Sequence, residues 1–394
     1  MAAGMTERED DEDVLDISEQ TNRPLDDALH QQRVQAWHPI LDPVWVIVAL
    51  FYLGVILVPT GYKIHSLQDD VVELRRTYDD YDPDEGTVLS CPIGDNFNAN
   101  KTCNLDFYAP KDMEPPILVY YELTNFHQNH RAYVQSRDDF ELNGEGSDAS
   151  QKKKCDPLRV LGNMTLSPCG LIANTFFNDI FKLVGGVDAN GFDLEMSEEG
   201  IAWQSDIDYM FNQPKGFRYE ECPESTDCSD ENNTCCDGDE WSCGKKGTPW
   251  VDPKDGKCYR YYYPNENTTQ YLYETYEDII NPIEGVTNEH FIVWMRVALQ
   301  PSFRKLYGWI DQPIKKGTKL SFAITANYVV TRFRGSKSII ITTNSIFGGR
   351  NIYFGPIFYV VGYFCLIAGT FFAVKHIFRP RKLADPAYLH FKTD

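Results

Sequence analysis

The sequence predicts a membrane protein with two transmembrane helices and a large β-rich ectodomain, an antiparallel, sandwich-like α+β fold held by disulfides. Three observations support this prediction. Two apolar segments, 44–58 and 353–374, lie near the two ends of the chain and contain no Asp, Glu, Lys or Arg. Every cysteine except Cys365 lies between them. Several parts of the intervening stretch alternate apolar and polar residues, as half-buried strands do.

The domain organisation follows from these two segments. The predicted regions are a cytosolic tail and pre-membrane segment at 1–43, a transmembrane helix at 44–64, a lumenal or extracellular ectodomain at 65–351 with a Cys-rich acidic insert at 222–258, a transmembrane helix at 352–375 and a cytosolic tail at 376–394. At about 1.5 Å per residue, the second apolar segment spans roughly 33 Å, enough for a bilayer core. The first reaches a similar length only by continuing through Pro59, where we expect a kink. For each segment the alternative is a buried helix of a soluble protein.

Basic residues predict the orientation of the two spans. A cluster follows the second span, whereas the segment before the first has no Lys and carries Arg23 and Arg33 nearest the membrane. The cluster consists of Lys375, His376, Arg379, Arg381 and Lys382. Positive charge favours the cytosolic side, so we expect both termini in the cytosol and the ectodomain in the lumen or outside the cell.

Composition narrows the function classes. The chain has 394 residues and a formal net charge of −21, which argues against nucleic acid as a partner. The acidic segment 1–29 is predicted to be a disordered tail, because it holds too little apolar surface to fold. It shows no cleavable signal peptide, so the first apolar span would serve as a signal anchor.

Cysteines in the predicted ectodomain are expected to form disulfides, since their number there is even and the compartment is not cytosolic. Cys91 and Cys103 bracket a turn-rich segment, and a local bridge there would contribute about 3 kcal/mol in the chain-entropy model. Cys155 and Cys169 could close a second local bridge.

The insert carries a further six-cysteine pattern, C-x5-C-x6-CC-x6-C-x14-C, formed by Cys222, Cys228, Cys235, Cys236, Cys243 and Cys258. Three bridges in some connectivity are predicted. One alternative is an inhibitor-cystine-knot arrangement, which would pair Cys222 with Cys236, Cys228 with Cys243 and Cys235 with Cys258. The acids around these cysteines are interpreted as solvated, since no EF-type calcium loop is present.

Four N-x-[ST] sequons lie on the same predicted side of the membrane as the cysteines, at Asn100, Asn163, Asn232 and Asn267. We predict these residues to be N-glycosylation acceptors.

Local patterns predict the main elements of the ectodomain. Segment 69–76 is predicted to be a short polar stretch, possible as a helix, in which the chain leaves the membrane. Segments 117–124, 320–330 and 338–343 are predicted strands, the second because apolar residues recur at every other position. Segment 170–181 is apolar enough for the core. Segment 289–299 has helical spacing, with Asn288 as a cap and Pro301 as a stop.

A search for catalytic chemistry finds none in the sequence. It contains no Gly-rich phosphate loop, no DKTGT phosphorylation site, no HExxH and no nucleophile elbow. His127 and His130 are candidate metal ligands, but no third ligand stands at a fitting spacing, so a hydrogen-bonded polar network is the preferred interpretation. We therefore predict a protein that is not an enzyme and holds no metal or cofactor.

Several longer segments carry a family resemblance. They are QQRVQAWHPI (31–40), LVPTG (57–61), YELTNFHQNHRAYVQSRDD (121–139), PCGLIANTFFND (168–179), GIAW (200–203), EHFIVWMRVALQPSFRKLYGWI (289–310), TTNSIFGGRN (342–351) and LADPAYLHF (383–391). The chain resembles the cell-division-cycle fifty / ligand-effect-modulator family, the non-catalytic beta subunits of type IV P-type ATPases that flip phospholipids. The six-cysteine insert lies outside the common pattern.

The resemblance implies a function and a set of partners. The chain would form a heterodimer with the catalytic subunit of such an ATPase, in contact with membrane lipid, and would be needed for its export from the endoplasmic reticulum and for flippase activity that maintains phospholipid asymmetry. Its location would run from the endoplasmic reticulum to the Golgi, endosome or plasma membrane, depending on the partner. Cys91–Cys103 and Cys155–Cys169 would match disulfides of the family. Candidate partner-binding residues are Gln32, Arg33, Trp37, Pro59, Asn125, Asn129 and Arg131.

Two other functions fit a two-span protein with a Cys-rich ectodomain: a ligand-gated channel subunit and a receptor-like ectodomain. A channel needs a hydrophilic pore lining. Apart from Thr60, Thr370 and the terminal Lys63 and Lys375, the predicted spans offer only glycines and aromatic hydroxyls. This favours the accessory subunit.

Overall fold

The computed structural model describes residues 27–31, 34, 43–83, 88–96, 99–188, 190–222, 248–254 and 256–380. The chain divides into two compact units, one made of Met1–Pro59 with Phe358–Asp394 and the other of Thr60–Ile357. Both predicted spans are long apolar helices, α1 at Pro43–Asp69 and α8 at Phe354–Phe378, each long and apolar enough to cross a membrane. Together with the antiparallel sheets between them, they confirm the predicted fold class.

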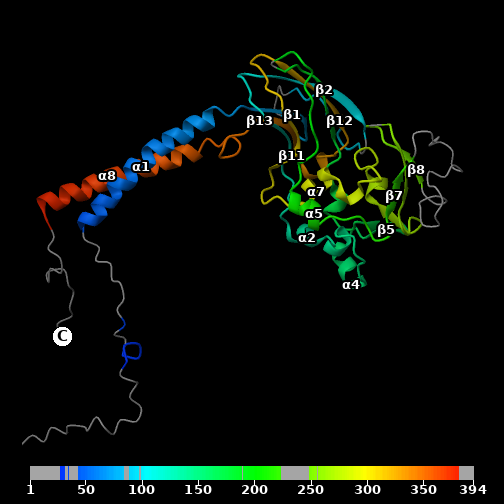
Figure 1. Cartoon of the computed structure of the whole chain (residues 1–394), viewed down its shortest axis with the longest axis horizontal. Coiled ribbons are helices and arrows are strands. Elements are labelled where there is room, and N and C mark those ends of the chain that lie inside the picture. The colour runs from blue at the N-terminus through cyan, green and yellow to red at the C-terminus, as the bar shows by residue number, and fades with distance from the viewer. Residues whose placement is uncertain are drawn as a thin grey trace, which may run out of the picture. The chain divides into compact units, whose positions relative to one another are not determined.

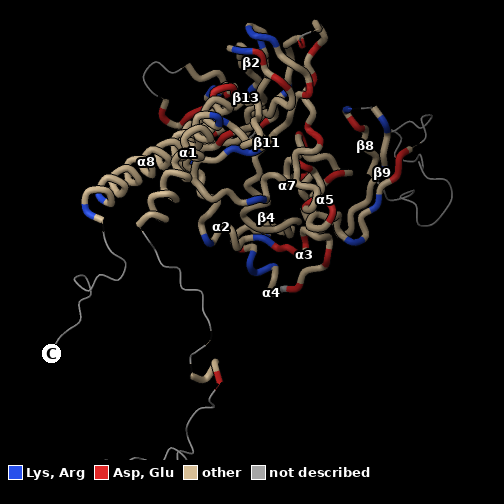
Figure 2. Tube along the Cα trace, turned by 60° about the vertical axis from the view of Figure 1, so that its left-hand side comes forward, with Lys and Arg blue, Asp and Glu red and all other residues tan. Residues whose placement is uncertain are grey.

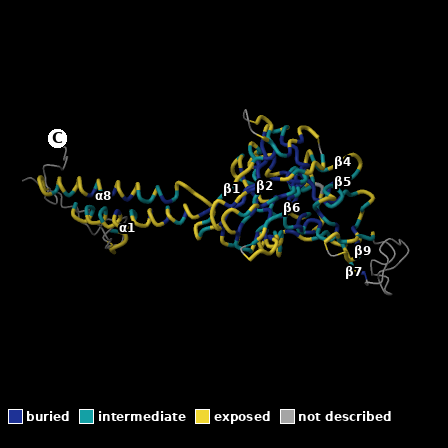
Figure 3. The backbone as a smooth tube through the Cα atoms, turned by 90° about the horizontal axis from the view of Figure 1, so that it is seen from above, coloured by how far each residue is buried: buried dark blue, intermediate teal, exposed yellow. Residues whose placement is uncertain are grey.

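Within the first unit, α1 and α8 run side by side and approach closely at glycines (Figures 1 and 3). A Cβ atom added to Gly54 would lie 2.6 Å from Leu366 Cγ, and one added to Gly362 would lie 2.8 Å from Val58 Cγ2. Small residues let helix backbones come close enough for dispersion contacts, the main attraction between helices in lipid. Most other side chains of both helices are exposed in the structure, which suits a surface facing lipid or a partner.

The described residues of the second unit form thirteen strands in four sheets. The strands are β1 Glu73–Asp80, β2 Lys101–Tyr108, β3 Ile117–Leu123, β4 Val160–Leu161, β5 Met164–Ser167, β6 Ile180–Gly185, β7 Arg218–Glu221, β8 Thr248–Val251, β9 Cys258–Tyr262, β10 Thr269–Tyr271, β11 Phe303–Ile310, β12 Lys319–Ala326 and β13 Ser336–Thr343. Their orders are β1-β13-β3-β11, β2-β12-β6, β10-β5-β4 and β7-β9-β8. All the ladders are antiparallel except β10–β5, which is parallel.

Short helices connect and cover these sheets. They are α2 Arg131–Gln135, α3 Asp139–Leu142, α4 Ala149–Lys152, α5 Gln204–Tyr209, α6 Leu272–Thr275 and α7 Glu289–Met295, with single 3₁₀ turns η2 Lys153–Cys155, η3 Ala173–Thr175, η5 Gly285–Thr287 and η6 Thr331–Phe333. The side chain of Asn288 accepts a hydrogen bond from the Phe291 N–H, so the predicted cap of α7 is confirmed.

The core lies where the four-stranded sheet meets the β2-β12-β6 sheet (Figure 3). Phe181 of β6 packs between Tyr78 of β1 and Tyr307 of β11, with ring centroids 5.9 and 4.6 Å apart. Tyr121 of β3 stacks on Phe177 at 4.0 Å. Because residues of one strand alternate between its two faces, one face of β12 reaches this core with Leu320, Phe322, Ile324 and Ala326.

Three local predictions need correction. Segment 69–76 is not a helical exit: α1 ends at Asp69, and β1 begins at Glu73 because its backbone pairs with β13. The helix predicted at 289–299 ends at Met295, where Lys305 binds the carbonyl groups of Val293 and Trp294 in its last turn. The strand predicted at 320–330 ends at Ala326, where β2 and β6 no longer offer partners.

Candidate functional site

Two disulfides close short loops in the ectodomain. Cys91 is joined to Cys103 and Cys155 to Cys169, across sequence separations of 12 and 14 residues. Cys91, Cys155 and Cys169 are buried. The Cys91–Cys103 bridge ends on β2, and Cys169 precedes the apolar segment 170–181, which supplies Ile172, Phe176 and Phe181 to the core as predicted. These bridges therefore fasten loops onto the hydrophobic core.

The insert is described only at its borders. Cys222 and Cys258 are both disulfide-bonded, and the Cys222 N–H donates a hydrogen bond to the Cys258 carbonyl. Cys228, Cys235, Cys236 and Cys243 lie outside the described residues, and so does the predicted knot pairing. Beside the border strands, Tyr261, Tyr263 and Tyr271 form a small cluster of buried aromatic side chains that gives this part of the ectodomain its own core.

Three of the four predicted glycan acceptors lie on described parts of the surface. Asn100, Asn163 and Asn267 are exposed, and Asn100 has a left-handed backbone with φ of 45°. Asn232 lies outside the described residues. Exposure is what an N-glycan requires, so these positions remain predicted acceptors.

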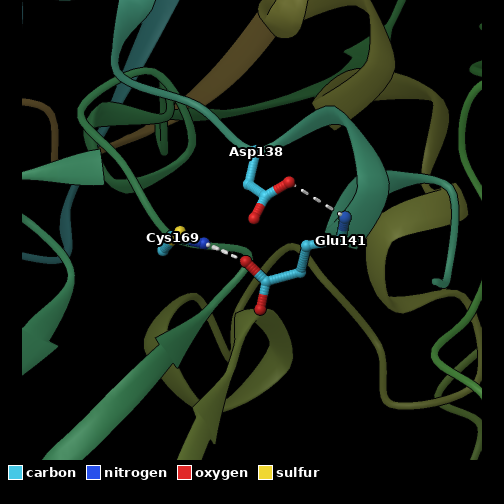
Figure 4. A group of neighbouring side chains, drawn as sticks. All are labelled: Asp138, Glu141 and Cys169. Carbon is cyan, nitrogen blue, oxygen red and sulfur yellow. Dashed lines mark hydrogen bonds between the residues drawn. The ribbon is translucent and has the colours of Figure 1, made fainter. Parts of the chain in front are cut away.

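One group of side chains has the spacing of a metal site, formed by Asp138, Glu141 and Cys169 (Figure 4). Its chemistry does not fit a metal. The Cys169 sulfur is bonded to Cys155 and is no thiolate. Asp138 caps α3 by accepting from the N–H groups of Phe140 and Glu141, and Glu141 accepts from the Cys169 N–H at 3.0 Å. Burial raises the pKa of Glu141. His127 and His130 are not part of this group.

A buried ionic network ties the strands that lead to the two membrane helices. Lys337 of β13 contacts Asp179 at 2.8 Å and Asp79 of β1 at 3.3 Å. Asp179 also accepts from the hydroxyl of Tyr78 at 2.7 Å and from the N–H groups of Asn327 and Tyr328. Burial raises the pKa of Asp79 and of Tyr78. Nothing in the sequence indicates this network, because Lys337 stands between Ser336 and Ser338 at the start of the strand and has no acidic residue near it in the chain.

Segments distant in the sequence meet around α7. The carboxylate of Glu289 accepts from the N–H groups of Gly200 and Ala202, both at 2.9 Å. The Trp294 indole donates to the carbonyl of Ile172 at 2.8 Å. Just after the helix, the Arg296 guanidinium forms a bidentate ion pair with the Asp206 carboxylate of α5, with N–O distances of 2.6 and 3.0 Å.

Lys305 of β11 caps the C-terminal end of α7. Its ammonium group donates to the carbonyls of Val293 and Trp294, each at 2.9 Å, and to that of Arg296. It also lies 5.5 Å from the centre of the Trp294 ring. Burial, and next the nearby Arg296 charge, lower the pKa of Lys305 to about 7.

The outer side of this junction carries exposed residues that we together call the α7 rim: Trp203, Arg296, Leu299, Asn129 and Arg131. The Arg296 guanidinium lies 4.7 Å from the centre of the Trp203 ring, and the Asn129 side chain donates to the Leu299 carbonyl at 2.8 Å. Leu299 is 85% and Trp203 66% exposed. A large exposed aromatic and an exposed aliphatic residue beside two arginines are typical of protein interfaces.

The predicted partner-binding residues fall into three groups: some lie outside the described residues, one lies in α1, and the others lie in the ectodomain. Gln32, Arg33 and Trp37 lie outside the described residues, and Pro59 lies inside α1. Asn125 has a φ of 58°, and its amide donates to the Phe333 carbonyl at 2.5 Å, so its contact with a partner stays a prediction. The Asn129 side-chain amide likewise donates to a backbone carbonyl, that of Leu299. Arg131 is exposed, at the first position of α2.

One hollow in the described part of the ectodomain has a volume of about 570 Å³ and a strongly acidic lining. Its acidic lining residues are Glu198, Glu199, Asp252, Glu277, Asp278, Glu284 and Glu289. Within its lining, His290 binds Glu198 at 2.9 Å and packs on Tyr307. We assign no chemistry to it.

Comparison with known proteins decides the family. The model of the LEM3 (ligand-effect modulator 3) family / CDC50 family matches residues 64–382. The chain belongs to the CDC50 family. The matched range spans the ectodomain, α8 and the residues around the α7 rim, so Asn125, Asn129 and Arg131 lie inside it. Gln32, Arg33, Trp37 and Pro59 precede it.

Full-length relatives agree with this assignment. The chain is 32% identical over 375 residues to ALA-interacting subunit 3 of Arabidopsis thaliana, covering 94% of this chain and 90% of the relative. It is 32% identical over 370 residues to Cell cycle control protein 50A of Bos taurus, covering 91% of each. It is 30% identical over 402 residues to the Phospholipid-transporting ATPase accessory subunit CRF1 of Saccharomyces cerevisiae, covering 95% of this chain and 90% of the relative.

Proposed function

We propose that this CDC50-family chain is the non-catalytic accessory subunit of a phospholipid-translocating P-type ATPase. The observation that carries the proposal is the similarity over nearly the whole length to a yeast protein whose name states that role. The ATPase would supply the phosphorylated aspartate and the lipid path. This chain would be needed for export of the ATPase from the endoplasmic reticulum, for its flippase activity and hence for phospholipid asymmetry.

The proposed topology places both termini in the cytosol and the ectodomain on the lumenal or extracellular side. The basic residues after α8 support this orientation, and Figure 2 shows Lys and Arg at that end of a helix that otherwise carries almost none. The disulfides and exposed sequons favour the same side, because disulfides persist in oxidising compartments. The ectodomain would then cover the non-cytosolic loops of the ATPase.

The α7 rim is the part of the ectodomain that we propose for this contact. Its exposed Trp203 and Leu299 would lose water on binding, and Arg296 and Arg131 would set charge complementarity.

A subunit that binds one conformation of a pump more tightly than another shifts the equilibrium between these conformations by that difference in affinity. We propose that the phosphoenzyme conformations are the favoured ones. Equal affinity for every trapped conformation would exclude this mechanism.

The partnership is tested by purifying the full-length chain in mild detergent and identifying bound proteins by mass spectrometry. The proposal predicts one large P-type ATPase in near-equal amount. Leu299→Asp should reduce its recovery, because a charge replaces an apolar contact, whereas Val251→Asp, at another exposed apolar position, should not. Recovery of no P-type ATPase under conditions that preserve the folded chain would refute the proposal.

A further inference from the structure

A second hollow, of about 460 Å³, lies where the ectodomain meets the start of α8. Strand residues of β3, β11 and β13 form one wall, and the segment 344–353, which joins β13 to α8, forms the other. The segment is fixed to the last turn of α1: the Asn351 N–H donates to Gln68 Oε1 at 2.8 Å, and the Gln68 amide donates to Ser345 at 3.3 Å. Gln68 is almost fully buried, so the segment has a defined position.

The charge of this hollow differs from that of the rest of the chain. Among the described residues, its lining contains Arg304 and Arg350 and neither Asp nor Glu, in a chain whose formal net charge is −21. Arg304 is held by Glu73 at 3.0 Å and lies over the Tyr120 ring. Arg350 is exposed and forms no ion pair with another described residue. Its guanidinium group is therefore available to an anion.

The remaining lining and its surroundings are those of a membrane interface. Tyr353 lines the hollow, is 70% exposed and directly precedes Phe354, the first residue of α8. Ile352 is also exposed in the lining, and Ile346 of the same segment is 92% exposed. Exposed aromatic and aliphatic side chains beside the end of a membrane helix are expected at headgroup depth.

We propose that this hollow binds the phosphate of a membrane phospholipid, with Arg350 as its main ligand. The guanidinium fork matches the geometry of phosphate oxygens. Asn344 and Asn351 in the lining offer further amide donors, and Ile352 and Tyr353 would contact the glycerol and upper acyl chain. The proposal depends on membrane insertion and not on the identity of the ATPase partner, so it can be tested on this chain alone.

The test uses the purified full-length chain in a phosphate-free maltoside detergent, with native mass spectrometry to count bound ligands. The probes are dihexanoyl phosphatidylserine, dihexanoylglycerol, which lacks the phosphate, and inorganic phosphate. The variants are Arg350→Gln, Arg350→Lys and the control Lys315→Gln, which removes a positive charge from an exposed turn. Thermal unfolding of each variant confirms that it is folded.

The proposal predicts saturable binding of the short phospholipid, weaker binding of both other probes, and about a tenfold loss of phospholipid affinity in Arg350→Gln. Arg350→Lys should recover part of the affinity, and Lys315→Gln should leave it unchanged. Equal phospholipid affinity in the wild type and Arg350→Gln would overturn the proposal. Binding of inorganic phosphate as tight as that of the phospholipid would also overturn it, because the site would then recognise an anion only.

Discussion

The ammonium nitrogen of Lys337 lies 2.8 Å from a carboxylate oxygen of Asp179, and both side chains are completely buried. Lys337 also donates to the Tyr328 carbonyl at 2.6 Å. Lys337 belongs to β13, which leads to α8, and its second partner Asp79 belongs to β1, which follows α1. The contact between Lys337 and Asp79 therefore joins the two strands that are next to the membrane helices in the chain.

Replacing Lys337 by Met should strongly destabilise the ectodomain, because Asp179 and Asp79 would stay buried without a counter-charge. Removing one partner of a buried ion pair costs about 3–5 kcal/mol. For a domain of this size that lowers the unfolding temperature by roughly 10 °C. Thermal unfolding in detergent measures this decrease in the unfolding temperature. The control is Lys315→Met, which removes a positive charge at an exposed position. Similar unfolding temperatures for the two variants would show that the network adds little stability.

Lys305 should make the stability of the ectodomain depend on pH. Its pKa in the folded chain is about 7, below its ordinary value of 10.5, because burial disfavours the charge. Between these two pH values the unfolded chain binds one more proton, so stability should rise with pH across that window, by at most about 1.4 kcal/mol per pH unit.

The measurement compares unfolding free energies of the wild type and Lys305→Met from pH 7 to pH 9, so that other titrating groups cancel. The difference should shift in favour of the wild type as pH rises. Parallel pH profiles would mean that the three carbonyl groups around Lys305 keep its amine charged throughout.

Gly362→Leu should push α1 and α8 apart, because even a Cβ atom there would lie 3.0 Å from the backbone nitrogen of Val58. Spin labels on the exposed residues Trp45 and Ile377 report the separation, which should grow by about 2 Å. Val361→Leu is the matched control, since Val361 is exposed on the same helix. An unchanged distance in Gly362→Leu would show that the helices do not depend on this contact.

The sequence was most informative where one local pattern decided the structure. The apolar spans, the alternation Leu320–Phe322–Ile324–Ala326 and the spacing of Cys91 from Cys103 each led to the observed element. Segment 69–76 was misread because the strand character of β1 comes from pairing with β13, more than 250 residues away, and such pairing overrides weak local preferences.

The candidate site was less predictable, for a physical reason. Asn125 and Asn129 are predicted to bind a partner, and this role stays a prediction. Their amides also donate to carbonyls of this chain, which only the three-dimensional fold reveals. The surface position of Trp203 has no signal in the sequence either, although its side chain is mostly exposed beside Arg296. Surface position depends on tertiary packing around α7, whose contacts join segments far apart in sequence.

Glycosylation tests the proposed orientation of the membrane spans. Asn100→Gln, Asn163→Gln and Asn267→Gln should each remove one endoglycosidase-sensitive shift in electrophoretic mobility, because these exposed residues would face the lumenal enzyme that attaches glycans. A sequon placed after Lys382 should stay unmodified. Glycosylation of that cytosolic-tail sequon, with none in the ectodomain, would reverse the topology.

The most direct test of the central claim reconstitutes the co-purified ATPase complex, the ATPase alone and this chain alone into vesicles, and measures ATP-dependent phospholipid translocation. The account predicts translocation by the complex, little by the ATPase without this chain, and neither ATP hydrolysis nor translocation by this chain alone. Translocation by this chain alone, or full activity of the ATPase without it, would contradict the account.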